Sequence, residues 1–557
     1  MSQIDAYTAT LTESRAPKIL KKADNYDMKK SRYSKMTTCA LAGIEGVPIE
    51  IELCLMAGLP AFDLGGNCDS TVKESRDRVR AAISNSFYVF PKGKVLASYS
   101  PAAFPKSGTA FDLALALSVL EASGQITRPR GAPEIAAFGE LSLDGRVNTI
   151  PGILNRLLTL EKAGIREVIG PPCEFDCSKY LSNCTYYVVS NLTEAVEIYS
   201  GIVPAKKVIA KRQIDLQSID KHKKSNSASF LNRLAGQEAG IRAITIAAAG
   251  WHPLLLMGAP GCGKTSLAAA VAEILPPLSD EETLEVLLVE QIADVATHRK
   301  KPQERPFRRP HHTITASALL GGGVPPKLGE CTLAHCGVLF LDELTEVKPK
   351  ALDVLREPME LREIHLARSS WRITYPADFL LIAACNPCRC GERLEADGDC
   401  RCSEYSVERH LDRISGPLYD RFDLVSQLNR VKAPTLEASL QQNNESRAVK
   451  IKASVESAWE RQKKRCERLG TEFYFNSLIP AEELLSFMQM NEDCLKFISE
   501  LAAKMCFSFR SFHSVLRVAR TIADLRSADV VTEEDLALAL DYRLALPSIM
   551  SERSDIA

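Results

Sequence analysis

The sequence predicts a multidomain α/β protein with an α+β N-terminal domain, a parallel-sheet core and a helical C-terminal domain. Its 557 residues exceed the length of one ordinary domain. Strand-like and helix-like runs alternate over residues 230–433, as in a parallel sheet, whereas residues 434–557 show almost only helical periodicity. Residues 36–203 mix both patterns. A polar, Lys-rich leader at 1–35 is predicted to be disordered, and a Lys-, Ser- and Asn-rich stretch at 204–229 is predicted to be a linker.

Three segments define the expected N-terminal domain. Residues 47–55 are predicted to form a strand, because charged and apolar residues alternate along them. Residues 70–84 carry charges at helical spacing, and residues 110–122 are typical of an amphipathic helix. This mixture predicts an α+β domain.

The core and the C-terminal domain are predicted from apolar runs and helical spacing. The core has expected strands at 254–257, 337–341 and 379–384, and an Ala-rich helix at 267–274. In the C-terminal domain, Thr532-x-x-Asp535 resembles a capping box and predicts a helix start. The helices expected there cover residues 436–470, 480–490, 494–508, 512–526 and 532–546.

Charge and apolar patterning exclude two classes of protein. Lys plus Arg number 69 and Asp plus Glu number 70, so bulk basicity cannot hold nucleic acid or a membrane, and any polyanion contact must be a local patch. No apolar run reaches the roughly 18 residues that span a bilayer, and no apolar segment follows the N-terminal lysines as in a secretory signal. The 17 cysteines are too few for a disulfide scaffold of this length. We therefore expect a cytoplasmic protein without a membrane partner.

The segment LLLMGAPGCGKTSL predicts an ATP site. A buried strand leads into Gly258-x-x-x-x-Gly263-Lys264-Thr265, and a helix follows. Glycines let backbone N–H groups approach phosphates, the helix N-terminus adds positive partial charge, Lys264 adds a point charge, and Thr265 can ligate Mg²⁺. The residues predicted to bind the nucleotide are Gly258, Ala259, Pro260, Gly261, Cys262, Gly263, Lys264, Thr265 and Ser266.

Two further strand ends strengthen this prediction. Strand 337–341 ends in Asp342, which is predicted to hold Mg²⁺, and Glu343, which is predicted to polarise the attacking water. A third strand, 379–384, ends at Cys385-Asn386, and the polar Asn386 there can sit between the two earlier strands and orient that water against the γ-phosphate. Together these strand ends describe the AAA+ class of ring-forming ATPases. In that class a neighbouring subunit supplies an arginine that stabilises charge in the transition state.

From residue 37 nearly to the C-terminus, the sequence resembles the ComM (YifB) family of magnesium-chelatase-like AAA+ proteins. The resemblance implies a hexameric, DNA-stimulated ATPase that acts as a helicase in branch migration and helps to integrate DNA during natural transformation. Lys264, Asp342, Glu343 and Asn386 match the family's phosphate loop, second acidic motif and first sensor. The segments that carry the resemblance are GLPAFDLGG, SRDRVRAAI, FDLALALSVLEASG, RRPHHTITASALLGGG, PKLGECTLAHCGVLFLDEL, NPCRCG, ISGPLYDRFDL and VLRVARTIADL.

The resemblance also implies roles for two arginines. Arg421, in YDRFD, stands where related chelatase ATPases carry their trans-acting arginine finger, and Arg510, in SFRSFH, matches the second sensor on the helical lid. Arg421 could instead form a structural ion pair with Asp420 or Asp423, and Arg510 could be a solvated helix position.

The family's N-terminal domain looks like the protease domain of Lon, a ribosomal-S5-domain-2-like fold that cuts peptides with a Ser–Lys pair. Here Ala110 stands at the serine position of Lys106-Ser107-Gly108-Thr109-Ala110, and residues 151–156 have no lysine at the matching place. A Ser–Lys mechanism needs a hydroxyl beside a deprotonatable amine. The domain is therefore predicted not to be a peptidase but to help assembly or DNA contact.

A cysteine cluster lies within residues 385–402. Cys388-x-Cys390 and Cys400-x-Cys402 are two thiol pairs separated by nine residues. Four thiolates brought together can bind tetrahedral Zn²⁺, in a structural role because no ligand position stays open. The alternative is a loop of reduced cysteines. Cys385 ends a buried strand and is expected to pack in the core.

Two basic segments are predicted to contact DNA. RPFRRPHHT carries Arg308 and Arg309, and residues 363–375 have the pattern of a hairpin with Arg368 and Arg372 beside its turn. In ring ATPases a hairpin just before the first sensor often points into the central channel. Either segment could instead be a solvated basic surface. Phosphate contacts by these residues predict an affinity that falls steeply with salt.

Three functions stay open at the level of sequence. The first is a hexameric DNA motor, the second a chelatase-type remodeller that drives metal insertion into a tetrapyrrole through a partner, and the third a protease regulator. The Lon-like domain, the GLPAF segment and the cysteine cluster favour the first, because chelatase motor subunits lack them. Stimulation of ATP turnover by single-stranded or branched DNA would distinguish the three.

Overall fold

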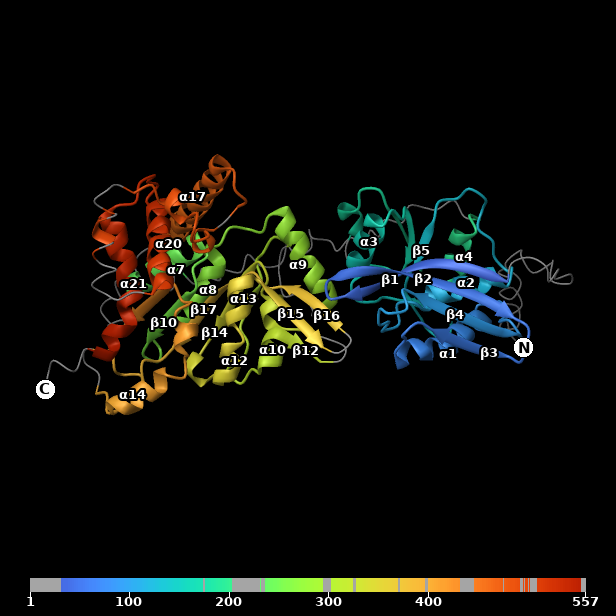
Figure 1. Cartoon of the computed structure of the whole chain (residues 1–557), viewed down its shortest axis with the longest axis horizontal. Helices are drawn as coiled ribbons and strands as arrows, with labels where there is room; N and C mark the ends of the chain where they lie inside the picture. Colours follow the sequence, from blue (N-terminus) through green and yellow to red (C-terminus); the bar gives the residue numbers. More distant parts are fainter. Residues whose placement is uncertain are drawn as a thin grey trace, which may run out of the picture. The chain divides into compact units, whose positions relative to one another are not determined.

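The computed structural model divides into two compact units (Figure 1). One contains Met1–Ala40, Val47–Ile150 and Arg156–Arg212, and the other contains Leu41–Gly46, Pro151–Asn155 and Gln213–Ala557. The predicted linker and most of the predicted leader lie outside the described residues. Those described are 32–173, 176–202, 231, 236–293, 302–323, 327–368, 371–395, 399–430, 445–473, 475–490, 494, 496–498, 500 and 508–551.

The first unit is built on a mixed seven-stranded sheet in the order β3-β4-β2-β1-β5-β8-β9. β2 and β4 pair antiparallel, whereas β1, β5, β8 and β9 pair in parallel. β1 begins at Tyr33, inside the segment predicted to be leader, because its side chains alternate between the core and solvent. The strands are β1 Tyr33–Ala42, β2 Glu45–Met56, β3 Ala61–Gly65, β4 Lys94–Ser100, β5 Ile135–Ala137, β8 Glu167–Gly170 and β9 Thr185–Val188, and a separate pair is β6 Glu140–Leu141 with β7 Val147–Asn148.

Both helices predicted in this unit are present. α1 (Ser70–Asn85) starts at Asp69, whose carboxylate accepts a hydrogen bond from the backbone N–H of Val72 at 2.8 Å. α2 (Asp112–Ala122) is apolar on nearly every side and is buried along almost its whole length. The remaining helical segments are α3 Ile153–Lys162, the 3₁₀ turn η2 Cys177–Tyr180 and α4 Leu192–Tyr199.

The second unit has a five-stranded sheet in the order β11-β14-β17-β10-β18, and every neighbouring pair is parallel. β17 lies between β14 and β10, so Asn386, just beyond its end, follows the strand between the two others. Because the strands are parallel, all their carboxyl ends meet at one edge of the sheet, which is where such sheets bind ligands. The strands are β10 Leu254–Gly258, β11 Phe307–Arg308, β14 Gly337–Leu341, β17 Phe379–Cys385 and β18 Leu424–Leu428.

The three central strands β14, β17 and β10 send alternate side chains into two different cores. On β10, Leu254 and Leu256 join the core with α7, α8 and the C-terminal helices, whereas Leu255 and Met257 join the core with α11 and α12. Burial on both faces explains why these strands are continuous apolar runs in the sequence. The helical segments of this part are α7 Glu238–Gly250, α8 Lys264–Ile274, α9 Asp280–Ala293, α10 Ala316–Leu320, α11 Glu330–Leu333, η3 Leu344–Glu346, α12 Pro349–Asp353, α13 Arg356–Leu361, α14 Glu404–Leu411 and α15 Gly416–Tyr419.

Two small hairpins complete the core of the second unit. β15 (Glu363–Arg368) pairs antiparallel with β16 (Trp371–Pro376), which confirms the predicted strands of the hairpin; its turn at 369–370 lies outside the described residues. β12 (Gly321–Gly322) pairs with β13 (Lys327–Leu328).

The C-terminal helices differ from prediction in one place. The helix expected at 480–490 is only α18, Leu484–Met488, because a turn follows Pro480 and Gln489 adopts a left-handed conformation with φ 44°. The others agree within the described residues, and the reciprocal cap is present, since Asp535 accepts from Thr532 N–H at 2.9 Å. Residues 436–444 and most of 494–508 lie outside the described part. The observed segments are α17 Glu445–Leu469, η4 Asn476–Leu478, α20 Phe509–Leu525 and α21 Glu533–Ser551.

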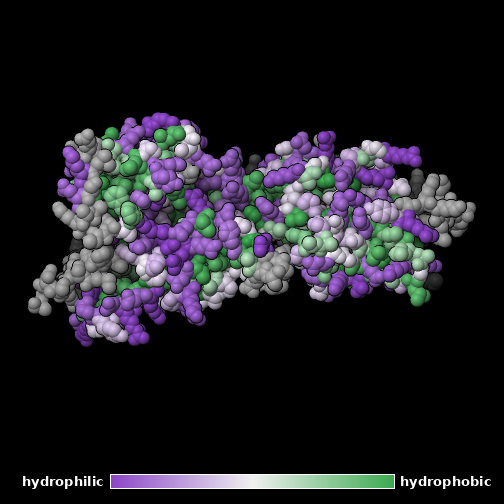
Figure 2. Space-filling view, viewed as in Figure 1, coloured by the Kyte–Doolittle hydropathy of each residue, from purple (hydrophilic) through white to green (hydrophobic). Residues whose placement is uncertain are grey.

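The outer surface agrees with the mixed composition. On the visible face of both units, hydrophilic and hydrophobic residues are interspersed (Figure 2). Among the described residues, no helix combines the length and the apolar character that crossing a membrane requires.

Candidate functional site

The phosphate loop connects β10 to α8 at the carboxyl edge of the parallel sheet. Gly261 and Gly263 have φ of 82° and 96°, values that favour glycine, and Gly263 caps the start of α8. A Cβ on Gly258 would lie 2.4 Å from the carbonyl oxygen of Leu428, so this strand end also requires glycine. The loop therefore turns its backbone into the first turn of a helix, where N–H groups are available to phosphate oxygens.

Lys264 is held at the centre of this loop. Its Nζ donates to the carbonyl oxygens of Gly258 and Ala259 at 2.7 and 2.9 Å, and to Oδ1 of Asn386 at 3.1 Å. The structure thus brings the predicted phosphate-binding lysine and the predicted first sensor into direct contact. Asn386 is itself positioned from α14, because its carbonyl oxygen lies 3.2 Å from Nε2 of His410.

The second acidic motif lies on the neighbouring side of the loop. The Thr265 hydroxyl donates to Oδ2 of Asp342 at 3.0 Å. A hydroxyl and a carboxylate so close together are oxygen ligands of the kind that Mg²⁺ takes in nucleotide sites, so this pair fits the metal. Glu343 follows in a left-handed conformation (φ 50°), and its carboxylate lies 2.8 Å from Nδ1 of His312.

The basic segment RPFRRPHHT lies at this site, a placement that was not predicted from the sequence. Arg309 pairs with Asp342 at 2.7 Å, and Arg308 pairs with Glu330 at 2.7 Å. Arg305, from the same segment, is buried, pairs with Glu282 and lies over two tryptophan rings. The segment contains β11 and continues beyond its end toward Asp342 and Glu343, and its arginines form ion pairs with acidic groups of the same unit.

Arg421 and Arg510 are brought together by one carboxylate. Their guanidinium groups donate to the same atom, Oε1 of Glu360 on α13, at 2.7 and 2.6 Å. Arg421 does not pair with Asp420 or Asp423, the two partners that the sequence offered. Asp420 pairs with Arg543, and Asp423 pairs with His252. Arg421 and Arg510 line one pocket, together with Arg362 and Arg517.

This arginine pocket lies at the edge of the sheet opposite to the phosphate loop. Arg421 precedes β18, and Pro253, which precedes β10, also lines the pocket. The two edges are separated by the length of the strands, roughly 15 Å for five residues. An arginine side chain cannot cross that distance, so neither Arg421 nor Arg510 reaches the phosphate loop of its own chain.

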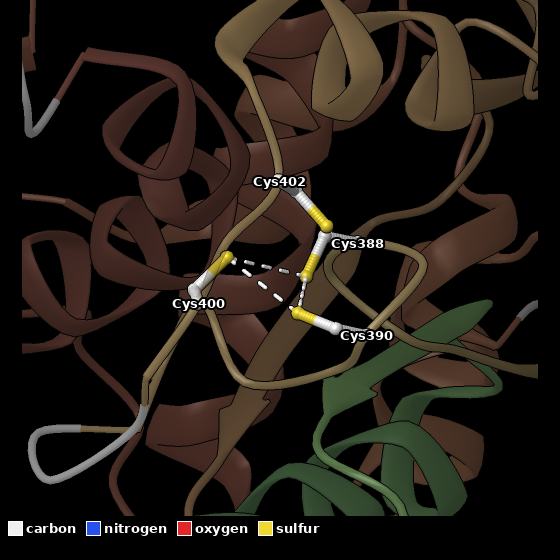
Figure 3. Close-up of side chains that lie close together, drawn as sticks. All are labelled: Cys388, Cys390, Cys400 and Cys402. Carbon is white, nitrogen blue, oxygen red and sulfur yellow. Dashed lines mark hydrogen bonds between the residues drawn. The ribbon is translucent and has the colours of Figure 1, made fainter.

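The four cysteines of the predicted cluster converge beside the phosphate loop (Figure 3). The Sγ atoms of Cys388 and Cys390 are 3.3 Å apart, those of Cys388 and Cys400 3.8 Å, and those of Cys390 and Cys400 3.6 Å. All four sulfurs, including that of Cys402, lie within 4.8 Å of one another. Cys385 is buried in the core, as expected.

The predicted DNA hairpin is only partly described. Arg372 is exposed on β16, and Arg368 ends β15, but nothing is described of the Arg368 side chain. In the N-terminal unit, Ala110 is buried where the Lon-like pattern would need its nucleophile.

Three residues that organise these sites were not predicted from the sequence. Gln237 is buried and donates to the carbonyl oxygens of Cys262 and Asn429 at 2.8 and 2.7 Å, which ties the phosphate loop to the end of β18. The other two are His312 and Glu360. The doublet of histidines at 311–312 is visible in the sequence, but its position beside Glu343 depends on tertiary structure. Nothing in the sequence distinguishes Glu360 from other helix-surface glutamates.

Comparisons with known proteins cover nearly the whole chain. A family model described as magnesium chelatase, subunit ChlI, matches residues 230–436, one described as subunit ChlI of Mg-chelatase matches 51–174, and one described as the magnesium chelatase subunit ChlI C-terminal matches 445–543. The uncharacterized protein YifB of Salmonella typhimurium is 36% identical over 91% of this chain and 96% of its own length. The competence protein ComM of Haemophilus influenzae is 34% identical over 90% and 96%. Lon protease 2 of Bacillus subtilis is 33% identical over 24% of this chain and 25% of its own length.

Proposed function

The chain belongs to the ComM/YifB family of magnesium-chelatase-like AAA+ proteins, and from this premise we propose that it is an ATP-driven DNA motor, a hexameric helicase that drives branch migration in recombination or natural transformation. The observation that carries the ATPase part is the convergence of Lys264, the Thr265–Asp342 pair and Asn386 at one sheet edge. The DNA part is supported by the likeness to a protein named for competence.

The residues of one chain supply half of the proposed catalytic site. The phosphate loop and Lys264 bind the phosphates, Asn386 orients the attacking water, and Glu343 accepts its proton. When bound by Thr265 and Asp342, Mg²⁺ would offset phosphate charge. His312 positions the Glu343 carboxylate, and Arg309 lies against Asp342, so both belong to this half of the site in the proposal.

The other half is proposed to come from a neighbouring subunit. Arg421 and Arg510 lie together at the opposite edge, where they would stabilise charge on the neighbour's terminal phosphate. Phe509, which precedes Arg510, is 87% exposed, an apolar group that a neighbouring subunit could cover. A head-to-tail contact of this kind closes into a ring, for which the proposed state is a hexamer.

For the DNA contact, the hairpin β15–β16 is proposed to lie in the central channel. Arg372 is exposed there and carries positive charge, whereas Arg308 and Arg309 are engaged by acidic groups, so Arg368 and Arg372 are the stronger DNA candidates. Affinity for single-stranded DNA should fall when both are replaced by alanine, and the slope of log affinity against log salt should become shallower by about one for each lost phosphate contact.

The alternative is a chelatase-type remodeller of a protein partner, which the magnesium chelatase family models favour. The experiment that separates the two is ATP turnover of the purified chain with and without single-stranded or branched DNA, followed by branch migration of a model Holliday junction. The motor predicts stimulation by DNA, lost in Lys264→Ala and Glu343→Gln. An active oligomer that no DNA stimulates would favour the remodeller, or the role of protease regulator.

The proposal also includes a structural Zn²⁺ on Cys388, Cys390, Cys400 and Cys402.

A further inference from the structure

The cysteine cluster has the dimensions of a tetrathiolate metal site. A tetrahedral zinc with bonds of about 2.3 Å holds its sulfurs about 3.8 Å apart. The separations of 3.3, 3.6 and 3.8 Å between the cysteine sulfurs lie at or just below that value. Figure 3 shows the sulfurs of all four residues gathered together, two from the segment that holds Cys388 and Cys390 and two from the segment that holds Cys400 and Cys402.

The turn that carries the first pair of cysteines is closed by its own backbone. The N–H of Gly391 donates to the carbonyl oxygen of Cys388 at 3.1 Å, so the chain turns back directly after Cys390. This turn leaves the sulfurs of Cys388 and Cys390 3.3 Å apart, and each of them lies within 3.8 Å of the sulfur of Cys400.

A second cluster in the described part of the chain lacks this arrangement. Glu285, His335 and Cys336 also lie close together, but Nδ1 of His335 accepts the backbone N–H of Asp378 at 3.2 Å. Nε2 must then carry the ring proton, which it donates to Glu285 at 3.0 Å. That nitrogen has no free lone pair for a metal, so the trio is a hydrogen-bonded structural contact.

The segment that holds Cys388 and Cys390 packs directly against the phosphate loop of the proposed ATP site. Gly391 has φ of 83°, and a Cβ placed on it would lie 2.4 Å from Cδ of Pro260 in the phosphate loop. At its start, Cys388 follows Asn386 by two residues. Two residues that follow Gly391 form ion pairs at 2.7 Å, Arg393 with Glu404 and Glu392 with Arg430.

We infer that Zn²⁺ bound by Cys388, Cys390, Cys400 and Cys402 braces the nucleotide site, by holding Gly391 against Pro260 and fixing the chain just beyond Asn386. The inference rests on the proposed ATPase function and adds a metal dependence to it. The two ion pairs hold Glu392 and Arg393, whereas a bound metal would hold the four cysteines themselves and so order the segments that carry them. Removal of the metal frees the loop, so the phosphate loop loses the surface on which Pro260 rests.

The experiment uses the full chain purified without added zinc. Metal analysis should find one zinc per chain, and replacement by Co²⁺ should give the absorption of a tetrahedral thiolate site. Cys400→Ser should lose the metal, whereas the control Cys184→Ser, a half-buried cysteine outside the cluster, should keep it. A zinc content well below one, or iron in its place, would overturn the metal assignment.

The brace is tested by nucleotide affinity, measured by binding of a fluorescent ADP rather than by turnover. Zinc removal and Cys400→Ser should each weaken binding on the order of tenfold, and returning zinc to the stripped parent should restore it. Gly391→Ala should weaken binding while keeping its zinc, because it displaces Pro260 directly. The matched control is Gly164→Ala, since Gly164 has a similar φ of 88° and an added Cβ there would meet nothing within 4 Å.

The outcomes separate the two proposals. Zinc bound at one per chain, with unchanged affinity in the stripped protein and in Gly391→Ala, would overturn the brace and leave the metal site. A zinc-loaded parent that binds no adenine nucleotide would instead overturn the proposed ATPase. If Cys400→Ser fails to fold, Gly391→Ala and the reversible zinc removal still decide the matter.

Discussion

Glu360 connects the two arginines to the hairpin at the scale of single residues. Its carboxylate accepts hydrogen bonds from Arg421, in the turn before β18, and from Arg510, in the first turn of α20. Its own helix, α13, leads into β15 after one residue in a left-handed conformation, Arg362. Burial alone would raise the pKa of Glu360, but the hydrogen bonds from Arg510 and Arg421 outweigh it and hold the pKa below its usual value. Glu360 is therefore charged near neutral pH. In the proposed function it competes with the neighbour's terminal phosphate for both guanidinium groups.

Replacement of Glu360 should make these arginines easier to transfer to a neighbour's phosphate. In Glu360→Gln we expect the KM for ATP to fall about threefold to tenfold, because the competing ion pairs, though partly exposed, are lost. Steady-state ATP turnover at a fixed concentration of the assembled oligomer measures the change. Glu357→Gln, an exposed glutamate on the same helix, is the control and should match the parent. A KM that rises in Glu360→Gln while the oligomer stays intact would show that Glu360 positions the arginines for use instead of withholding them.

At the scale of elements, the apolar strands and the phosphate loop were predictable because short sequence segments determine them. β10, β14 and β17 are buried on both faces, so each is a continuous apolar run followed by its functional residue. β11 was not predicted, since it has only two residues and exists through its pairing with β14. The placement of Arg309 and His312 depends on that pairing, which explains why their segment was interpreted as a DNA patch. The contacts of Gln237 and Glu360 join segments distant in sequence, which no local pattern encodes.

The packing of the C-terminal helices α17 and α20 is stabilised by a buried acid, Asp524, on α20. Asp524 is fully buried and accepts from Arg520 at 3.1 Å and from Asn476 at 2.9 Å, and it also pairs with Arg465. Asp524→Ala leaves the buried Arg520 guanidinium without its carboxylate partner, so we expect a loss of about 3–5 kcal/mol in the free energy of unfolding.

Urea unfolding followed by tryptophan fluorescence measures this loss. All three tryptophans, Trp251, Trp371 and Trp459, belong to the second unit, and the first and last pack against Phe475 in its core. Asp541→Ala, an exposed position on α21, should change the midpoint by less than the equivalent of about 0.5 kcal/mol. An equally small change in Asp524→Ala would contradict the role given to this acid.

The contact between α9 and the start of β14 should depend on pH. The hydrogen bond from His335 is the main cause that lowers the pKa of Glu285. An acid with a depressed folded pKa stabilises the native state above its unfolded pKa and loses that contribution as the pH falls through the folded value. Because the Glu285 side chain is 56% exposed, the contribution is at most about 1 kcal/mol. The difference in urea midpoint between the parent and Glu285→Gln should be present at pH 7 and shrink only as the pH falls below about 4.3; a constant difference would contradict it.

At the scale of the whole molecule, the proposed function divides the catalytic site into two halves that lie on opposite edges of one sheet in each chain. Lys264, Asp342 and Asn386 lie at the carboxyl edge, and Arg421 lies at the amino edge. Parallel strands make this division unavoidable, because residues before and after a strand are separated by its full length. We therefore expect ATP turnover to require a contact between two chains, and a ring would repeat that contact so that every half is used.

Mixing two inactive variants tests this division. Lys264→Ala and Arg421→Ala should each reduce ATP turnover to near background, since one removes the phosphate contact and the other the transition-state charge. When the two are co-expressed in equal amounts, about a quarter of the contacts in a randomly filled ring combine an intact phosphate loop with an intact Arg421, so about a quarter of parental turnover should return. Lys264→Ala mixed with Glu343→Gln is the matched control. Both changes lie in the same half, every site keeps one defect, and turnover should stay at background. If the arginine acted within its own chain, neither mixture would recover, and the two-edge arrangement would lose its functional meaning.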